Sequence, residues 1–564
     1  MKIKISLFLC LLLFACTNRN PVYGENGMVV STSRQASQVG IDILKKGGNA
    51  VDAAVAVGFT LAVTSSSNGN IGGGGFMVAR FKDGKTFSLD YREMAPQAAF
   101  KDVFLDSIGN VIDGKSTRTH FASGVPGSVD GLLKAWKDHG SGNISLSELI
   151  GPAIDYAENG FKLSDYEARR FNNRKSFLSK HLETKRIFTR QDRKWMEGDV
   201  FYQKDLAETL KRIAKNGRDG FYKGRTAELI VEEMDKVGGW ISLNDLKNYS
   251  SKYRKPIYGN FNGYKIISMG PPSSGGILLV LMLNMIDEII KTNQYEADDL
   301  NFNSKEYVHL LTEVERRAYA DRATHLGDED FWEVPTSMLL SKEYARQRVK
   351  DIDRYKASTS KEVKAGALVQ KESEETTHYS VVDKSGNAVS VTTTINSGYG
   401  SGITVSGAGF ILNNEMDDFS SKPGVPNMFG LLGNEANAIE PAKRPLSSMT
   451  PTIVLKDDKP YLILGTPGGS TIITTVLQNF LNVTFHQMSI KEAVDAPRFH
   501  SQWMPDMIDY EKNSLSKKVI KNLQKMGHVL DQRGSIGEAN GIMIDSLGFW
   551  GGADIRGENS AIGY

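Results

Sequence analysis

The sequence changes its pattern at Glu375, and this change restricts the fold more than any other feature of the chain. Residues 130–370 follow a mostly amphipathic, helical pattern that is interrupted by a strand-like segment at residues 264–268. Directly afterwards, residues 376–383 and 388–395 form two segments rich in Val and Thr on either side of a Gly-Asn turn, which predicts a β-hairpin. Residues 451–465 predict a second hairpin. Because the first half alone would leave its sheet incomplete, we expect both halves to build one body of sheet layers covered by helices.

The N-terminal part of the chain predicts two consecutive helices and a strand pair. Residues 33–46 have apolar positions at helical spacing and are followed by two glycines that can end the helix. Asn49 is a good N-cap for a second helix over residues 50–63, which is apolar around most of its circumference and is therefore expected to be buried. Residues 76–80 and 86–91 predict paired strands.

The first residues indicate export. Residues 5–15 form a mostly apolar run after two lysines, shorter than the roughly 20 residues that span a bilayer and typical of a signal peptide. The run ends in Leu13-Phe14-Ala15-Cys16, which resembles a bacterial lipobox. This predicts a signal peptide over residues 1–15, lipidation of Cys16, a tether over residues 16–26, and a location in the periplasm or at the cell surface. An ordinary signal peptide cut near Ala15 is the alternative.

Composition excludes several classes of function. The chain has 68 basic and 66 acidic residues, so it lacks the basic excess of a nucleic-acid binder. Its two cysteines, Cys10 and Cys16, both lie in the export segment, which excludes cysteine catalysis and cysteine-bound metals in the mature chain. The histidines show no zinc-binding spacing. Gly72-Gly73-Gly74-Gly75 lacks the context of a dinucleotide site or a P-loop and favours a tightly packed bend. No metal or organic cofactor is expected.

Taken alone, Thr376 and Thr377 are more typical of a strand than of a nucleophile. The surrounding residues 375–383, however, resemble the self-cleavage junction of the γ-glutamyltranspeptidases, which are N-terminal-nucleophile hydrolases. Further motifs that resemble this family follow in the family's order: GGNAVDAA at 47–54, IGGGGF at 71–76, DYREMAP at 90–96, PPSSGG at 271–276, LNNEMDDF at 412–419, RPLSSM at 444–449 and GTPGGS at 465–470. The resemblance covers the chain from about residue 27 to Tyr564.

The resemblance implies an α+β fold, a four-layer αββα sandwich built jointly by two autoproteolytic fragments. The large subunit would span residues 27–375 and the small subunit residues 376–564, with cleavage between Glu375 and Thr376. A threonine hydroxyl is a poor nucleophile and needs a base. Cleavage would supply one, because the freed α-amine of Thr376 has an unperturbed pKa of about 7.7–8.0. Nucleophile and base then belong to one residue.

The resemblance also assigns catalytic roles to residues around this threonine. Thr394 would hydrogen-bond the Thr376 hydroxyl and orient it; without the resemblance it is a plain strand threonine. Gly468 and Gly469 match the family's oxyanion hole, where backbone N–H groups stabilise the charge of the acyl-transfer intermediate. Without the resemblance, these glycines indicate a strand-to-helix turn.

Recognition of a γ-glutamyl group requires partners for one carboxylate and one ammonium. Arg92 offers a guanidinium fork for the α-carboxylate, and Ser447 and Ser448 can add hydroxyl donors. The ammonium would go to Asp418, assisted by Asn396 and Glu415, and the resemblance selects Asp418 over its neighbour Asp417. Taken singly, Arg92 could be a solvated charge, and Ser447 and Asp418 could be caps.

Residues 422–430 resemble the lid that covers the donor site in many members of the family. Some lids carry a tyrosine where this chain has Phe429. A hydroxyl hydrogen bond to Asn396 would then be missing and the lid would close through apolar contact. We therefore expect more hydrolysis relative to transpeptidation than in a member with the tyrosine.

The leading interpretation is a γ-glutamyl hydrolase and transpeptidase. It would act on glutathione and other γ-glutamyl compounds, transfer to amino-acid or peptide acceptors, and work as a heterodimer of its two subunits. Contact with a membrane would be through the lipid anchor alone, and no nucleic-acid partner is expected. Two alternatives stay open: an acylase of the same fold with another acyl donor such as a glutaryl group, and an uncleaved lipoprotein that only binds ligands.

Overall fold

The computed structural model describes residues 20–292, 295, 297–363, 376–422, 425, 427–428 and 433–564. The predicted signal peptide, the lipidation site Cys16, the cleavage-site residue Glu375 and the lid residue Phe429 lie outside these residues. Within the described ranges, no helix is both long and apolar enough to cross a bilayer.

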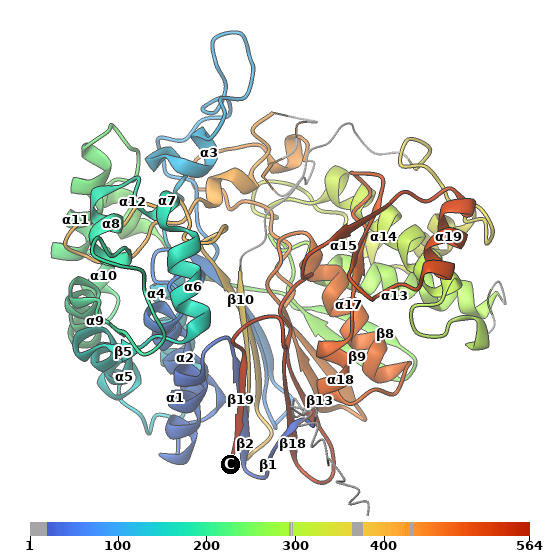
Figure 1. The fold of residues 1–564 in the computed structure, drawn as a ribbon, viewed down its shortest axis with the longest axis horizontal. Helices are drawn as coiled ribbons and strands as arrows, with labels where there is room; N and C mark the ends of the chain where they lie inside the picture. The colour runs from blue at the N-terminus through green and yellow to red at the C-terminus, as the bar shows by residue number, and fades with distance from the viewer. Residues whose placement is uncertain are drawn as a thin grey trace, which may run out of the picture.

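Two seven-stranded sheets form the centre of the molecule (Figure 1). The first has the order β19(Ser560–Gly563), β2(Gly27–Ser31), β10(Thr377–Asp383), β11(Ala388–Thr394), β3(Gly74–Arg80), β4(Thr86–Asp90), β7(Lys252–Arg254). The second has the order β1(Val22–Gly24), β18(Phe549–Ala553), β17(Asn540–Ile544), β13(Lys459–Leu464), β12(Thr452–Lys456), β9(Tyr264–Ser268), β8(Ile257–Phe261). Apolar side chains of both sheets, among them Val30, Phe76 and Ile453, pack together between them.

Helices cover the outer face of each sheet. On one side lie α1(Arg34–Lys45), α2(Ala50–Thr64), α4(Ser128–His139) and α5(Leu146–Asn159), with α6(Asp165–Asn173), α9(Lys204–Asn216) and α11(Gly224–Asp235) further out. On the other side lie α13(Gly275–Lys291), α14(Lys305–His325), α17(Thr471–Thr484) and α18(Ile490–Asp495), with α16(Lys342–Val349) and α19(Lys517–Met526). One apolar core fills each helix–sheet interface and a third lies between the sheets. The predicted α+β class with four αββα layers is confirmed.

The two halves of the chain share both sheets. Strands β10 and β11, which follow Thr376, pair with each other and insert between β2 and β3 from the first half. Every residue of β10 and β11 is buried, because α2 packs on one face of these strands and the second sheet on the other. The expectation that the first half alone would leave its sheet incomplete is confirmed.

The predicted helix ends are present. Ser33 caps α1, and Gly47 adopts the left-handed φ of 92° after it. Asn49 and Asp52 form a capping box at the start of α2, whose residues are all buried. The strand pair β3–β4 and the hairpins β10–β11 and β12–β13 also form as predicted, and their ends differ from the predicted ones by at most two residues.

Several strands were not predicted. Residues 130–370 contain β7 and β8 in addition to the expected β9, so this region is less uniformly helical than its pattern indicated. In β8, Ile257, Gly259 and Phe261 are buried and alternate with exposed residues, which is the period of a strand. Strands β17 and β18 of the second sheet and β19 of the first sheet, all near the C-terminus of the chain, were also not predicted.

Gly72 and Gly73 form the tightly packed bend that the sequence favoured, and Gly74 and Gly75 are the first residues of β3. A Cβ at Gly73 would lie 2.1 Å from the carbonyl oxygen of Thr394, and one at Gly72 would lie 2.2 Å from that of Ile411. Any larger residue would therefore push β3 away from the end of β11. The glycine run thus sets the position of the strand end that carries Thr394.

Candidate active site

Thr376 and Thr394 meet at one edge of the first sheet. Thr376 directly precedes β10 and Thr394 ends β11, and in this antiparallel pair Thr377 lies opposite Thr393. The two hydroxyl oxygens of Thr376 and Thr394 are 3.5 Å apart, and both side chains are buried. The Thr376 carbonyl oxygen accepts a hydrogen bond from the Asn68 side chain at 3.1 Å. The hairpin therefore brings together two residues that the sequence separates by 18 positions.

Asn396 fixes the Thr394 hydroxyl. Its backbone N–H donates to Thr394 Oγ1 at 2.8 Å, so the Thr394 O–H can donate towards the Thr376 oxygen. Asn396 holds a left-handed φ of 74°, which is uncommon for a residue with a side chain. Its side-chain amide donates to the Asn414 carbonyl at 2.8 Å, and this bond ties the end of β11 to the segment with the predicted acidic residues.

Gly468 and Gly469 lie beside Thr376, just before α17. Both have positive φ, 136° and 54°, and a Cβ on Gly468 would lie 2.4 Å from Thr471 Oγ1. Gly468 lines one cavity next to Thr376 and Gly469 lines another. Neither N–H donates a hydrogen bond to another residue in the part of the chain that the structure describes. With the positive end of α17 behind them, these groups suit an oxyanion.

A polar pocket extends from Thr376 to Arg92. Its lining consists of the predicted site residues Thr376, Thr394, Arg92, Asn396, Glu415, Asp418, Ser447, Ser448 and Gly469 together with Arg322, Met449 and Ile472. The Arg92 guanidinium is buried and forms ion pairs with Glu415 and Asp418. Its Nε donates to the Pro445 carbonyl at 3.3 Å. The structure thus gathers a cation, carboxylates and hydroxyls beside the threonine.

Carboxylates outnumber the guanidinium groups at the Arg92 end of the pocket. Besides Glu415 and Asp418, Glu93 lies 3.6 Å from Arg92. Burial raises the pKa of Glu93 to about 7, opposed by the charge of Arg92. Burial likewise raises the pKa of Glu415 and Asp418, again opposed by Arg92. An added positive charge would stabilise the ionised carboxylates, so the pocket favours a ligand that brings an ammonium group.

Asp418 faces the pocket and Asp417 does not. Asp417 accepts hydrogen bonds from the Ser116 hydroxyl and, at 2.8 Å, from the Met428 N–H. Asp418 pairs with Arg92 and accepts from the Asn427 side chain at 3.2 Å. Of the two neighbouring aspartates, the one that the resemblance selected is therefore the one beside Arg92.

The comparisons with known proteins agree with the motifs. The family model described as gamma-glutamyltranspeptidase matches residues 36–564. The chain belongs to the γ-glutamyltranspeptidase family. It is 46% identical to the glutathione hydrolase proenzyme of Escherichia coli K12 (95% of this chain, 91% of that one) and 44% identical to that of Pseudomonas aeruginosa (94% of each). The predicted enzyme class, a γ-glutamyltransferase and hydrolase formed by autoprocessing, is confirmed.

Solved structures extend this agreement to the fold. The γ-glutamyltranspeptidase of Helicobacter pylori matches with a TM-score of 0.58 and 41% identity, covering 62% of this chain and 97% of the solved one. A cephalosporin acylase from Bacillus halodurans matches with a TM-score of 0.82 at 24% identity over 99% of both chains, which shows the shared fold.

Sequence reasoning missed Arg322 and Asn68. Arg322 lies on α14 and donates to Ser274 Oγ at 3.0 Å and to Ser448 Oγ at 3.3 Å, so it holds one of the predicted serines. The sequence of α14 gave no signal for this residue, because the helix is rich in charged residues and carries three buried arginines, Arg316, Arg317 and Arg322. Asn68 lies in the Ser- and Asn-rich break before the glycine run, where nothing local marks it.

Among the residues that the structure describes, one group of buried side chains could hold a metal ion. His309, Glu313 and His528 place ligand atoms within 4.8 Å of one another. His309 Nδ1 lies 2.7 Å from His528 Nε2, and Glu313 forms an ion pair with Arg317 at 2.7 Å. None of the three lines the pockets at Thr376.

Proposed function

We propose that the chain hydrolyses glutathione and related γ-glutamyl amides and transfers the γ-glutamyl group to amino acids or peptides. The observation that carries this proposal is the pocket that joins Thr376 to Arg92, Asp418 and two serines. These groups complement both charges of an α-amino acid, and the relatives in Escherichia coli and Pseudomonas aeruginosa are named glutathione hydrolase proenzymes.

The donor binds through its α-carbon substituents. Arg92, Ser447 and Ser448 take the α-carboxylate, because a guanidinium and hydroxyl donors match its oxygens. Asp418, with Glu415 and Asn396, takes the ammonium. The carboxylate of the donor then pairs with Arg92 and its ammonium pairs with Asp418. Both buried side chains, which pair with each other before binding, therefore keep a partner of opposite charge.

The reaction proceeds through an ester of Thr376. Its Oγ attacks the γ-carbonyl carbon while the hydroxyl proton passes to the free α-amine of the same residue. The C–N amide bond breaks, and that proton goes to the departing amine. Water or an acceptor amine then attacks the ester carbonyl, the Oγ–C bond breaks, and the attacking group gives its proton back to Thr376 through the α-amine. Gly468 and Gly469 donate N–H groups to the oxyanion in both steps.

Asp418→Asn separates this proposal from an acylase that takes a glutaryl group. A glutaryl donor lacks the ammonium, so it does not use the carboxylate of Asp418. We expect the ratio of kcat/KM for γ-glutamyl-p-nitroanilide to that for glutaryl-p-nitroanilide to fall roughly 100-fold, since truncating one partner of a buried charge pair has effects of this size. Both values are measured on the cleaved enzyme.

Asp417→Asn is the matched control, because it makes the same chemical change one residue earlier and outside the pocket. It is expected to leave the ratio within about twofold of wild type, as for substitutions away from a binding contact. An unchanged ratio in Asp418→Asn would favour the glutaryl alternative. Equal losses for both donors would show that Asp418 supports the fold rather than the ammonium.

The mature protein is proposed to be a heterodimer in which the large subunit, residues 27–375, follows the tether at residues 16–26, and the small subunit spans residues 376–564. An uncleaved, ligand-binding lipoprotein is the alternative from another class. Denaturing electrophoresis distinguishes the two, since the heterodimer gives two bands and the binder one band near full length. N-terminal sequencing of the smaller band is expected to begin at Thr376.

We also propose that Cys16 carries a lipid anchor and holds the enzyme at the periplasmic face of a membrane or at the cell surface. The lipobox-like end of the apolar run supports this proposal. Cys16→Ser is expected to move the activity from the membrane fraction to the soluble fraction of lysed cells, while Cys10→Ser leaves it in the membrane fraction. Intact mass of the wild-type large subunit gives the added acyl groups, and a mass without them would support an ordinary signal peptide.

A further inference from the structure

A second cavity opens at Thr376, opposite the donor pocket. It is lined by Asn68, Tyr166, Arg170, Thr376, Pro467, Gly468, Ser535, Gly537 and Glu538. Its volume is about 270 Å³, against about 20 Å³ for the donor pocket. Thr376 is the one residue that lines both, so each pocket reaches the nucleophile from its own side.

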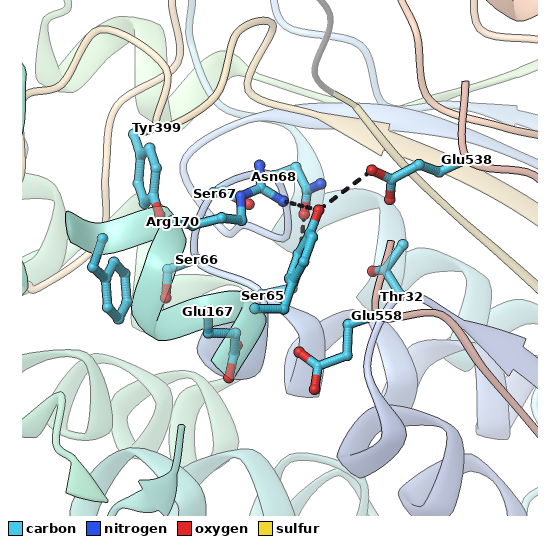
Figure 2. A pocket seen from close by; sticks show the side chains of 12 residues that line it. Thr32, Ser65, Ser66, Ser67, Asn68, Glu167, Arg170, Tyr399, Glu538 and Glu558 are labelled. Atoms are coloured by element: carbon cyan, nitrogen blue, oxygen red, sulfur yellow. Dashed lines mark hydrogen bonds between the residues drawn. The ribbon is translucent and has the colours of Figure 1, made fainter. Parts of the chain in front are cut away.

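The cavity continues outward past Arg170. Asn68, Tyr166, Arg170 and Glu538 also line a neighbouring surface pocket, which Figure 2 shows from close by. The Tyr166 hydroxyl contacts both Arg170 and Glu538. Dashed lines in Figure 2 mark these contacts at the labelled side chains of Arg170 and Glu538. The two pockets therefore share the part of their wall that carries the Arg170 guanidinium.

Arg170 is held in a defined position. It lies on α6 four residues after Tyr166, so both side chains project from one face of the helix. Arg170 Nη1 lies 3.2 Å from the Tyr166 oxygen, and the guanidinium stacks 5.4 Å from the centre of the Tyr166 ring. The Tyr166 hydroxyl donates to Glu538 at 3.4 Å, and the Glu538 backbone N–H donates to Thr466 Oγ1 at 3.0 Å. This chain of contacts ties Arg170 to the loop of the two glycines.

Two further carboxylates, Glu167 and Glu558, line the outer pocket. Burial, with the charge of Glu558 as a second cause, raises the pKa of Glu167 to about 8. Burial also raises the pKa of Glu558, which accepts a hydrogen bond from the Ser164 hydroxyl. The positive charge of Arg170 acts in the opposite direction and lowers the pKa of Glu167.

The reaction requires a place for the amine that leaves and for the amine that attacks. The glutamyl group occupies the donor pocket, so both amines must approach the Thr376 ester from the second cavity. The amine that glutathione releases is a dipeptide, whose nitrogen lies at the reacting carbon and whose carboxylate lies at the far end. The Arg170 guanidinium lies on the wall of this second cavity, and its charge and hydrogen-bond donors match such a carboxylate.

We infer that Arg170 binds the carboxylate of the leaving or accepting amino compound, and that it selects dipeptides and amino acids with a free carboxylate over neutral amines. Tyr166 and Glu538 act as positioning residues that keep the guanidinium on the wall of the cavity. This inference rests on the proposed function, since it concerns the second substrate of the same reaction.

Arg170→Gln tests the inference with two acceptors that differ only in the carboxylate. The donor is γ-glutamyl-p-nitroanilide, and transfer to glycylglycine is compared with transfer to glycylglycinamide at saturating donor. In wild type the acid is expected to have the higher kcat/KM after correction for the fraction of free amine. In Arg170→Gln this preference is expected to shrink roughly 10- to 100-fold, the effect of a hydrogen bond to a charged group. Arg170→Lys is expected to restore part of it.

Arg169→Gln is the matched control. Arg169 lies on the same helix, its side chain is exposed and pairs with Asp165 at 2.8 Å, and it does not line the cavity. The acid-over-amide preference of this variant is expected to equal that of wild type. Equal losses for both acceptors in Arg170→Gln, or an unchanged preference, would overturn the inference, because a purely structural arginine would not distinguish an acid from its amide.

The two proposals fail in different ways. If the proposed function is wrong, the wild-type enzyme releases no p-nitroaniline from the γ-glutamyl donor. If only the role of Arg170 is wrong, release by water is intact and the acid-over-amide preference does not follow the substitution.

Discussion

Replacing Thr376 with alanine is expected to leave one full-length chain without measurable turnover. In the proposed mechanism, the substitution removes the hydroxyl that attacks both the Glu375–Thr376 bond and the donor amide, and the Thr394 hydroxyl 3.5 Å away belongs to a residue without a free α-amine. We expect kcat for γ-glutamyl-p-nitroanilide to fall at least about 10⁴-fold, as on loss of a covalent nucleophile. Denaturing electrophoresis and intact mass report cleavage, and release of p-nitroaniline reports turnover.

Thr377→Ala is the control for this experiment. Thr377 is also buried, and its hydroxyl pairs with Thr32 at 2.8 Å rather than with Thr394. This variant is expected to be cleaved and active, because its hydroxyl takes no part in the chemistry. Turnover that survives in Thr376→Ala would remove the mechanism and with it the roles of Thr394, Gly468 and Gly469.

Local signals predicted the elements that surround the nucleophile. The capping box at Asn49, the alternating segments on either side of residue 386 and the glycine run at 72–75 each depend on nearest neighbours in the chain. The strands that were not predicted depend on contacts with residues that are far away in the chain. In β18, a Cβ on Gly552 would come 2.8 Å from the Ile490 carbonyl oxygen. In the sequence such a glycine suggests a turn, but in the structure it allows the close approach of α18.

The same distinction applies to the site. The donor pocket could be assigned from the sequence because its residues lie in motifs, such as those around Arg92 and Asp418. Arg170 and Arg322 lie on helices whose local patterns are ordinary, and only the packing of α6 and α14 against the nucleophile region brings them to the site. These two arginines become candidate site residues because the fold brings distant segments together. Their residue type alone does not mark them in the sequence.

Gly468→Ala is expected to lower kcat for γ-glutamyl-p-nitroanilide roughly 100- to 1,000-fold, the effect of removing one oxyanion donor. The φ of 136° at Gly468 is strained for any residue with a Cβ, and the new methyl group would lie 2.4 Å from Thr471 Oγ1. The loop must rotate to relieve both conflicts, and the rotation turns its N–H away from the reacting carbon. The donor pocket itself is not lined by Gly468, so KM is expected to change far less than kcat.

The measurement must separate a displaced N–H from a damaged fold. Rates are therefore expressed per cleaved enzyme, with the cleaved fraction taken from denaturing electrophoresis, and the Tm of each variant is recorded. Gly151→Ala in α5 is the control, because a Cβ there meets no atom within 4 Å and alanine favours a helix. A cleaved Gly468→Ala enzyme with the kcat of wild type would refute the oxyanion role. A rise in KM as large as the fall in kcat, together with a lowered Tm, would instead assign Gly468 to the packing of α17 against the second sheet.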